Sequence, residues 1–273
     1  MLRNRMPLIA LAVLLLGAGH GPKTRTQLAA KALSSGVSPV LANTLSTSFA
    51  GDDDVVSIGK PANMDLTPGV SVFSMSLWIK RGEAGDFERH TGGKARMAGG
   101  GQVGVVTGVR ADEAVEALVY GGENTFGGNI APGGVFGWHC YSMSINGATA
   151  RVYLDGTQVG STFAVGAGPW ETTASWLIGG SRGGNDVEVW YPWKGSIDEV
   201  TFWSDNLTDA QHVELCQRAV PMNPLAHTKV ANLIHWYRMG DGDTYPTITD
   251  RVGSANGTCQ NMAGAGNITS DVP

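Results

Sequence analysis

The sequence predicts an all-β protein, a two-sheet antiparallel β-sandwich of the jelly-roll type, with one short helix after the last main strand and an N-terminal hydrophobic leader. From residue 45 onward, short runs of β-branched and aromatic residues alternate with breaks made of Gly, Asp, Asn or Pro. The 39 glycines of the chain are scattered between these runs, where tight turns need them. Many short strands joined by tight turns are typical of sandwiches and jelly rolls.

The clearest strand signal covers residues 72–80 (VFSMSLWIK). Phe73, Met75, Leu77 and Ile79 occupy every second position, which is the pattern of a strand in a sheet with one buried face. The residues between them belong to the opposite face. Further strands are predicted near residues 54–58, 103–109, 114–120, 138–145, 149–154, 158–163, 176–178, 187–191 and 196–203.

A hairpin is predicted at Asp155-Gly156, which lies between the runs 149–154 and 157–163. A type I′ turn needs positive φ at both central residues, and an Asp-Gly pair adopts it readily. We therefore expect these two strands to pair antiparallel.

A helix is predicted to begin after Thr208. Thr208 and Gln211 have the spacing of a capping box, in which each side chain bonds to the backbone N–H of the other residue. The helix is expected to run to about Arg218, before Pro221.

Residues 1–21 have the pattern of a signal-like hydrophobic leader, with a basic start and an apolar stretch at 6–19 that ends in small residues. Because a transmembrane helix needs about 20 apolar residues, an export signal is the favoured interpretation. A retained hydrophobic arm in a larger assembly is the alternative, and contact with a membrane is expected only through this leader. Residues 22–44 are predicted to form a spacer, and residues 45–273 are predicted to form the jelly roll.

The charge of the chain bears on its partners. The formal net charge is −5, and every acidic residue lies at Asp52 or later. Because contacts to phosphate need clustered Lys and Arg, nucleic acid is not expected as a partner. An acidic body suits the binding of cations better.

Three cysteines, Cys140, Cys216 and Cys259, show no CxxC spacing. Neither a disulfide framework nor a zinc site is therefore indicated. We expect all three to be small buried hydrophobic residues.

Several segments, taken in order, resemble the laminin-G-like branch of the concanavalin A-like lectin/glucanase superfamily. They are SFAGDDDVV at 48–56, the strand at 73–80, Trp138-His139, TARVYLDGTQV at 149–159, GSIDEV at 195–200 and the helix region 207–215. Residues 232–262 resemble the unit that usually opens such domains. Residues 228–273 are therefore interpreted as a C-terminal extension that either completes the same sheet or begins a second repeat. This arrangement is similar to laminin-G-like proteins encoded by tailed bacteriophages.

The resemblance implies a calcium site on the rim of the sheet in many relatives. Calcium takes six to eight oxygen ligands, and the candidates are Asp53, Asp54, Asp198 and Asp250. Ala50 stands where the family has an acidic residue, so one ligand is missing. The alternative is that these carboxylates form turns and face solvent.

Glycan binding needs exposed aromatic rings with polar neighbours. Trp190, Tyr191 and Trp193 surround a proline in VWYPWK, and Trp170 flanks the preceding turn, so these four are the candidate ligand-binding residues. The alternative for each is packing in the core.

Catalysis by the glucanase mechanism needs two carboxylates on either side of a glycosidic bond. Asp198 and Glu199 are adjacent, so on a regular strand they point to opposite faces. The sequence therefore predicts no enzyme and no catalytic residues.

Together, these patterns predict a non-catalytic carbohydrate- or surface-binding module of a virion or an exported cell surface. Its expected partner is a glycan or a cell-surface or virion protein. The alternative is a structural virion or surface component without a small ligand, assembled as a homo-oligomer. A glycoside hydrolase of the glucanase branch is disfavoured.

Overall fold

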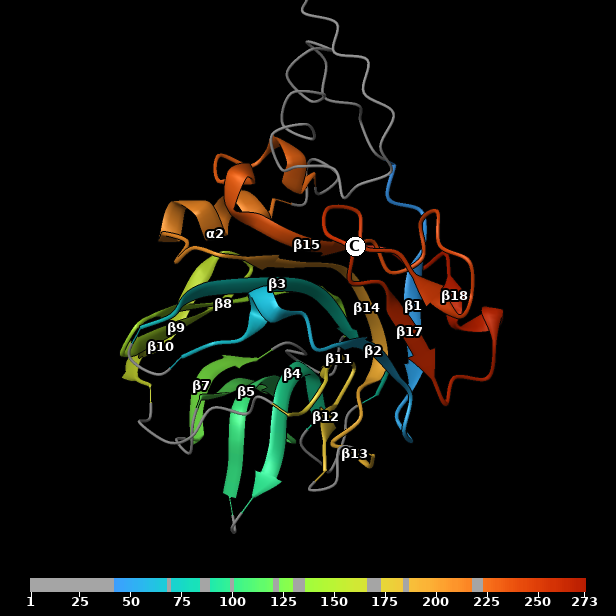
Figure 1. Cartoon of the computed structure of the whole chain (residues 1–273), viewed down its shortest axis with the longest axis horizontal. Coiled ribbons are helices and arrows are strands. Elements are labelled where there is room, and N and C mark those ends of the chain that lie inside the picture. The colour runs from blue at the N-terminus through green and yellow to red at the C-terminus, as the bar shows by residue number, and fades with distance from the viewer. Residues whose placement is uncertain are drawn as a thin grey trace, which may run out of the picture.

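The computed structural model describes residues 42–67, 70–83, 89–98, 101–119, 123–129, 136–165, 173–183, 187–217 and 223–273. The predicted leader, most of the predicted spacer and Trp170 lie outside the described residues. Within them, two antiparallel sheets lie face to face, which confirms the predicted β-sandwich (Figure 1).

Sheet A has the strand order β10-β9-β8-β3-β14-β1-β18 within the described residues, and β15 also pairs with β14. Its strands are β1 (Ser46–Ala50), β3 (Val72–Arg81), β8 (Trp138–Asn146), β9 (Thr149–Leu154), β10 (Thr157–Ala164), β14 (Lys194–Trp203), β15 (Leu233–Tyr237) and β18 (Ile268–Thr269). One edge of β14 is shared, because β1 pairs with its first half and β15 with its second half.

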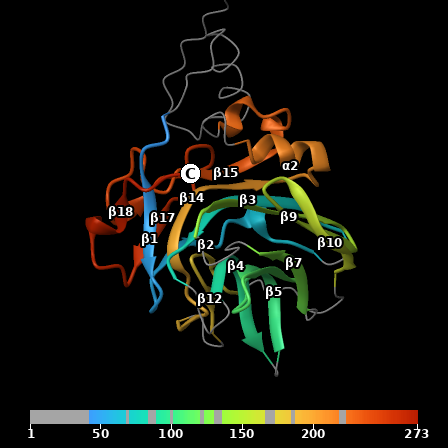
Figure 2. The ribbon, with the colours of Figure 1, turned by 180° about the vertical axis from the view of Figure 1, so that it is seen from behind.

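Sheet B has the order β16-β17-β2-β11-β4-β5-β6-β7 in the described part of the chain, and Figure 2 shows the two layers from behind. Its strands are β2 (Val55–Gly59), β4 (Arg89–Ala98), β5 (Gly101–Val109), β6 (Ala114–Val119), β7 (Glu123–Asn129), β11 (Trp176–Ile178), β16 (Thr247–Ile248) and β17 (Gly257–Gln260). A two-stranded hairpin is formed by β12 (Ser181–Arg182) and β13 (Val189–Trp190).

The main core lies between the two sheets. Phe73, Met75, Leu77 and Ile79 are each at most 1% exposed and belong to this core, which confirms the alternation predicted for β3. Trp176 of sheet B packs against Phe73 of sheet A, with ring centroids 5.7 Å apart. Burying one such side chain stabilises the fold by roughly 1.5–3 kcal/mol.

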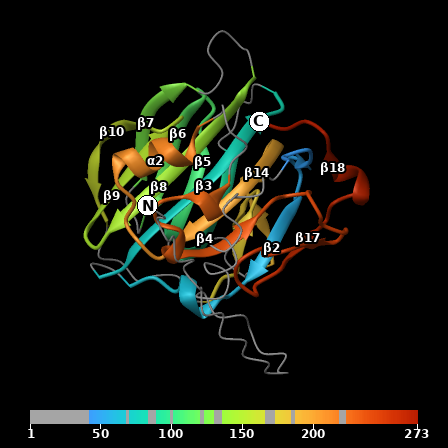
Figure 3. The same cartoon turned by 90° about the horizontal axis from the view of Figure 1, so that it is seen from above.

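The outer face of sheet A is also buried, so β3 is covered on both faces rather than on one. Ser74 and Ser76 are fully buried, and Trp78 is 2% exposed. The cover, called the cap here, consists of α2 (Asp209–Leu215), η3 (Pro224–Ala226) and η4 (Val230–Asn232). Figure 3 shows α2 across the outer face of sheet A. Serine tolerates either solvent or a polar interior, so alternation alone could not reveal this cover.

A second, smaller apolar cluster joins the cap to sheet A. Its buried members are Trp78, Trp138, Cys140, Trp203, Leu207, Leu215, Cys216, Leu233 and Trp236. Beside this cluster the contact is polar. The fully buried His212 of α2 lies with Nδ1 2.8 Å from Ser142 Oγ and Nε2 2.6 Å from Ser144 Oγ.

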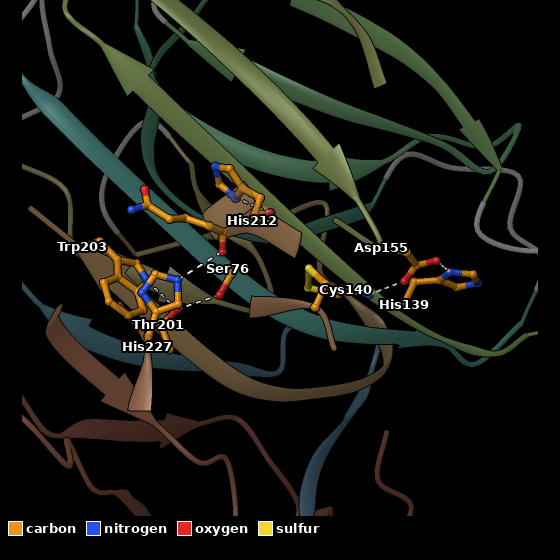
Figure 4. The surroundings of a disulfide bond; sticks show 11 residues. Ser76, His139, Cys140, Asp155, Thr201, Trp203, His212 and His227 are labelled. Carbon is orange, nitrogen blue, oxygen red and sulfur yellow. Dashed lines mark hydrogen bonds and ion pairs between the residues drawn. A yellow bond between two sulfur atoms is a disulfide. The ribbon is translucent and has the colours of Figure 1, made fainter. Parts of the chain in front are cut away.

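Cys140 in β8 and Cys216 directly after α2 form a disulfide bond, with their Cα atoms 5.5 Å apart (Figure 4). This corrects the expectation that the cysteines are unpaired hydrophobic residues. The two lie 76 positions apart, and only the packing of α2 against sheet A brings them together. Cys259 of β17 is buried and unpaired, as expected.

The predicted hairpin is confirmed. Asp155 and Gly156 have φ values of 50° and 80°, and β9 and β10 pair antiparallel on either side of them. The Asp155 carboxylate also accepts the Cys140 N–H at 2.9 Å, so the turn is fixed to β8.

The predicted helix is present but shorter than expected. The Thr208 N–H donates to Gln211 Oε1 at 2.9 Å, as a capping box requires. The helix α2 ends at Leu215 rather than near Arg218. Cys216, the next residue, is bonded to the sheet.

The C-terminal segment supplies strands to both sheets. β15 pairs with β14 and β18 with β1 in sheet A, whereas β17 pairs with β2 in sheet B. Within the described residues, the strands of this segment therefore belong to both sheets of the same sandwich. No helix in the described part of the chain is long and apolar enough to cross a membrane.

Candidate functional site

Two aromatic side chains are partly exposed where the β12–β13 hairpin leads into β14, at the end of the sandwich opposite the cap (Figure 1). Trp190 and Tyr191 are half-buried, and the neighbouring Glu188 is exposed. Arg89 of β4 lies beside them. These four residues are called the aromatic patch.

The indole ring of Trp190 lies close against the backbone of Gly183. A Cβ atom at Gly183 would come 2.4 Å from Trp190 Nε1, so only glycine allows this approach. Trp190 Nε1 also donates to Glu188 Oε2 at 3.3 Å. The hairpin therefore sets the position of the ring before any ligand arrives.

Tyr191 is held in the left-handed region of backbone space, with φ of 51°. For a residue other than glycine this conformation costs roughly 1–3 kcal/mol and is common at functional sites. The Tyr191 ring packs on the imidazole of His90, with centroids 4.6 Å apart, and its carbonyl accepts the His90 N–H at 2.7 Å. His90 Nδ1 in turn lies 2.8 Å from Ser181 Oγ.

Trp193 does not belong to the exposed surface. It is 0% exposed and packs in the main core, which corrects its prediction as a ligand-binding residue. Its backbone N–H donates to the Gly179 carbonyl at 2.8 Å, and β14 begins at the next residue. The chain has therefore already re-entered the sandwich at this point.

Arg89 joins the aromatic patch to the acidic turn between β1 and β2. Its Nη1 donates to Pro192 O and to Gly51 O, both at 3.0 Å. In the same turn, the Asp53 carbonyl accepts Asn261 Nδ2 at 3.1 Å. Two regions that the sequence singled out separately are therefore neighbours in space.

Asp53 and Asp54, two of the predicted calcium ligands, have different surroundings in this turn. Asp53 is exposed. Asp54 is buried, and its Oδ2 accepts the Ala50 N–H at 2.8 Å. Burial raises the pKa of Asp54, the Ala50 bond opposes that rise, and the charges of the adjacent aspartates add to it.

Asp250, the third predicted ligand, organises the C-terminal loop. Its Oδ2 lies 2.6 Å from His235 Nδ1 and accepts the Ala255 N–H at 3.1 Å. Its Oδ1 accepts the Gly253 N–H at 2.9 Å. Burial alone would raise the pKa of Asp250, but these bonds and the His235 charge hold it below its usual value.

Asp198, the fourth predicted ligand, lies with Glu199 in a β-bulge of β14, where Glu199 has φ of 47°. Both are 0% exposed. Asp198 accepts Asn43 Nδ2 at 2.8 Å, and Glu199 accepts Trp236 Nε1 at 2.5 Å and pairs with Arg238 at 3.2 Å. Burial, then the Glu199 charge, raises the pKa of Asp198 well above its usual value. The bulge removes the regular alternation that was expected to separate these two carboxylates.

The four predicted calcium ligands are therefore spread over the acidic turn, the β14 bulge and the C-terminal loop. Among the described residues, no three Asp, Glu, His or Cys side chains are placed to hold one metal ion. Asp198 and Asp250 use their oxygens on donors of the protein itself. These four residues are therefore not gathered around one ion, and calcium binding stays a prediction.

A shallow hollow of about 310 Å³ lies beside β1 and β18. It is lined by Ser48, Ala263, Gly264, Gly266, Asn267 and Thr269. This lining offers neither an aromatic ring nor a charge, so the aromatic patch is the better candidate for a sugar.

Three residues that shape the aromatic patch were not identified from the sequence. None of the three belongs to a motif. Arg89 and His90 lie far from Trp190 along the chain, and Gly183 belongs to a glycine pair like many others in the sequence. Their role depends on the fold of β4 beside the β12–β13 hairpin. A glycine immediately after a short strand is the only local signal, and it is a weak one.

A family model described as the concanavalin A-like lectin/glucanases superfamily matches residues 50–211. No curated protein sequence matches this chain.

Several solved structures have a similar fold. A putative carbohydrate binding protein from Bacteroides ovatus aligns with a TM-score of 0.60 and 17% identity over 85% of this chain, which spans 62% of that protein and thus less than two thirds of it. A SAP-like pentraxin from Limulus polyphemus aligns with a TM-score of 0.46 and 14% identity, over 64% of this chain and 82% of the pentraxin. The CBM40 module of a Ruminococcus gnavus sialidase aligns with a TM-score of 0.45 and 11% identity, over 64% of this chain and 100% of the module.

Proposed function

Since this chain belongs to the concanavalin A-like lectin/glucanase superfamily, we propose that it is a non-catalytic carbohydrate-binding module that holds its ligand against Trp190 and Tyr191. The observation that carries the proposal is the pair of partly exposed rings, fixed in place by Gly183 and His90. Rings that are positioned in advance lose little side-chain entropy when a ligand binds.

The chemistry of the aromatic patch suits a sugar. The apolar C–H face of a pyranose stacks on an aromatic ring, while hydroxyl groups need donors and acceptors at the edge of the ring. Glu188 is exposed beside Trp190 and can accept such hydrogen bonds, and the Arg89 guanidinium donates to the carbonyl of Pro192, the residue after Tyr191. The patch therefore combines an apolar platform with polar groups of both kinds.

A non-catalytic role is supported by the carboxylates. Glycoside hydrolysis needs two carboxyl groups that reach the scissile bond. Asp198 and Glu199, which the bulge brings together, are both fully buried and bonded to the protein. Asn43, Trp236 and Arg238 cover them, so neither carboxylate is exposed to a sugar.

We further propose that the module acts on the surface of a virion or an exported cell surface. The residues that lead into β1 lie at the cap end of the sandwich, and β13 lies at the opposite end (Figure 1). A module tethered through its N-terminal segment would therefore present the aromatic patch outward.

The direct test is binding of the full-length protein to a printed glycan array, followed by affinity measurement on the best glycan. Trp190→Ala and Tyr191→Ala should each weaken binding by about tenfold or more, because each removes a stacking surface. Val187→Ala is the matched control, since Val187 is 73% exposed on the same hairpin and lacks a ring. Equal binding by all four proteins would remove the aromatic patch from consideration.

Two further measurements separate the alternatives. A reducing-sugar assay on laminarin, agarose and carrageenan should show no turnover, and measurable turnover would contradict a non-catalytic role. Light scattering after size-exclusion chromatography should show no large assembly. A protein that binds no glycan and only its own copies would instead be a structural component.

A further inference from the structure

The cap depends on its contacts with sheet A. α2 has seven residues, and isolated helices shorter than about 12–15 residues are marginal in water. The contact that holds it is partly polar, through His212, and partly apolar, through Leu215 and its neighbours. Without a further link, such a short helix would open more readily than the strands beneath it.

The disulfide supplies this link at the end of α2. Cys216 directly follows the last helical residue, whereas Cys140 is a buried residue of β8 whose N–H donates to the Asp155 carboxylate. One sulfur therefore belongs to the sheet and the other to the cap (Figure 4). Cys140 is 0% exposed and Cys216 is 9% exposed, so a reductant would reach the bond from the Cys216 side.

The third cysteine cannot replace either partner in the folded protein. Cys259 belongs to β17 of sheet B and packs in the main core, away from the cap. Burial raises the pKa of its thiol to about 11. Because only the thiolate attacks a disulfide, Cys259 does not exchange with the bond between β8 and α2.

We propose that the Cys140–Cys216 disulfide is a redox-controlled latch of the cap. Oxidation closes the cap on sheet A, and reduction releases α2 while the two sheets stay folded. In the reducing step a dithiol gives two electrons and two protons, the S–S bond becomes two thiols, and the dithiol becomes a disulfide. Since disulfides persist in oxidising compartments, the cap closes fully only in such a compartment.

The test uses the full-length protein purified under oxidising conditions. Alkylation of the denatured protein, followed by mass spectrometry, should label one thiol before reduction and three after it. Hydrogen exchange is then measured with and without dithiothreitol. Exchange of the amides of residues 209–217 should become about tenfold faster or more on reduction, while the strands of sheet B keep their protection.

Variants distinguish the latch from a general loss of stability. Cys216→Ser and Cys140→Ser should each show fast exchange in α2 without reductant and no further change with it. Cys259→Ser is the control and should respond to dithiothreitol as the wild type does. Three labelled thiols before reduction, unchanged exchange in α2 on reduction, or loss of protection in all strands together with α2 would each overturn the proposal. The reduction of the wild type decides the question even where a variant fails to fold.

Discussion

The imidazole of His212 stacks on the ring of Tyr153, with centroids 3.8 Å apart and an interplanar angle of 18°. Its two nitrogens lie within hydrogen-bond distance of Ser142 and Ser144. The Tyr153 hydroxyl donates to Asp209 at the start of α2. The cap is therefore attached to sheet A through a histidine whose position suits the neutral ring.

Acidification should destabilise the protein through His212. Burial lowers the pKa of His212 from 6.5 to about 3. Between these values the unfolded chain binds a proton that the folded chain excludes, so stability falls as pH drops from about 6.5 toward 3. The slope for this one group is at most about 1.4 kcal/mol per pH unit. Urea unfolding from pH 7 to pH 4 measures it.

His212→Gln should remove this part of the pH dependence. It should also lower stability at pH 7 by about 1–3 kcal/mol, because Ser142 and Ser144 lose a buried partner. His139→Gln is the control, since the side chain of His139 is 18% exposed and contacts Asp155 at the surface. The same pH slope in wild type and His212→Gln would exclude His212 as the cause.

Rising pH should remove stability through Glu199. Burial raises the pKa of Glu199 to about 7, although bonds from Trp236 and Arg238 oppose that rise. The folded chain keeps a proton that the unfolded chain has released, so stability falls as pH rises from about 4.5 through 7. Because His212 contributes the opposite slope below about pH 6.5, thermal unfolding between pH 5 and pH 8 of the His212→Gln variant measures the loss.

Glu199→Gln should flatten this loss of stability with rising pH, because the amide has no charge to bury. Asp112→Asn is the control, since the side chain of Asp112 is 63% exposed on a loop of sheet B. A variant that loses stability with rising pH as steeply as the wild type would show that another group titrates.

Gly183→Ala should displace the Trp190 ring and weaken glycan binding by about tenfold without unfolding the protein. The new Cβ would stand 2.4 Å from Trp190 Nε1 and 3.0 Å from Glu188 Cβ, so the indole has to move. Affinity for the array-selected glycan and acrylamide quenching of tryptophan fluorescence measure the two effects. Gly266→Ala is the control, because a Cβ at Gly266 meets nothing within 4 Å. Full affinity in Gly183→Ala would show that the ring position does not matter.

We predict that calcium binding depends on Asp53 and not on Asp250. Asp53 is exposed, whereas the oxygens of Asp250 already accept from His235 and backbone N–H groups. We expect the heat of calcium binding after chelation to be lost in Asp53→Asn. Asp250→Asn should instead lower the melting temperature with or without calcium. No heat and no rise in the melting temperature of the wild type would end the calcium hypothesis.

Some of the candidate site could be predicted locally and some could not. Trp190 and Tyr191 were predicted because their run breaks strand alternation beside a proline, and both are partly exposed. Trp193 has the same local signal but is buried in the core, because β14 begins one residue later. Trp190 and Trp193 are only three positions apart, yet one is at the surface and the other in the interior. No sequence pattern of that length distinguishes the two environments.

The amino-acid sequence by itself determined strands such as β3, β8 and β9, the Asp155-Gly156 hairpin and the family, whereas β4 and β7 were not predicted. These depend on short-range alternation, on φ preferences at a turn and on an ordered set of motifs, all of which act within a few residues. Only the tertiary structure decided that Cys140 meets Cys216, that the cap buries the second face of sheet A, and that Asn43 and Trp236 cover Asp198 and Glu199. Each of these joins residues far apart along the chain, and their contact energies exist only once both sheets have formed.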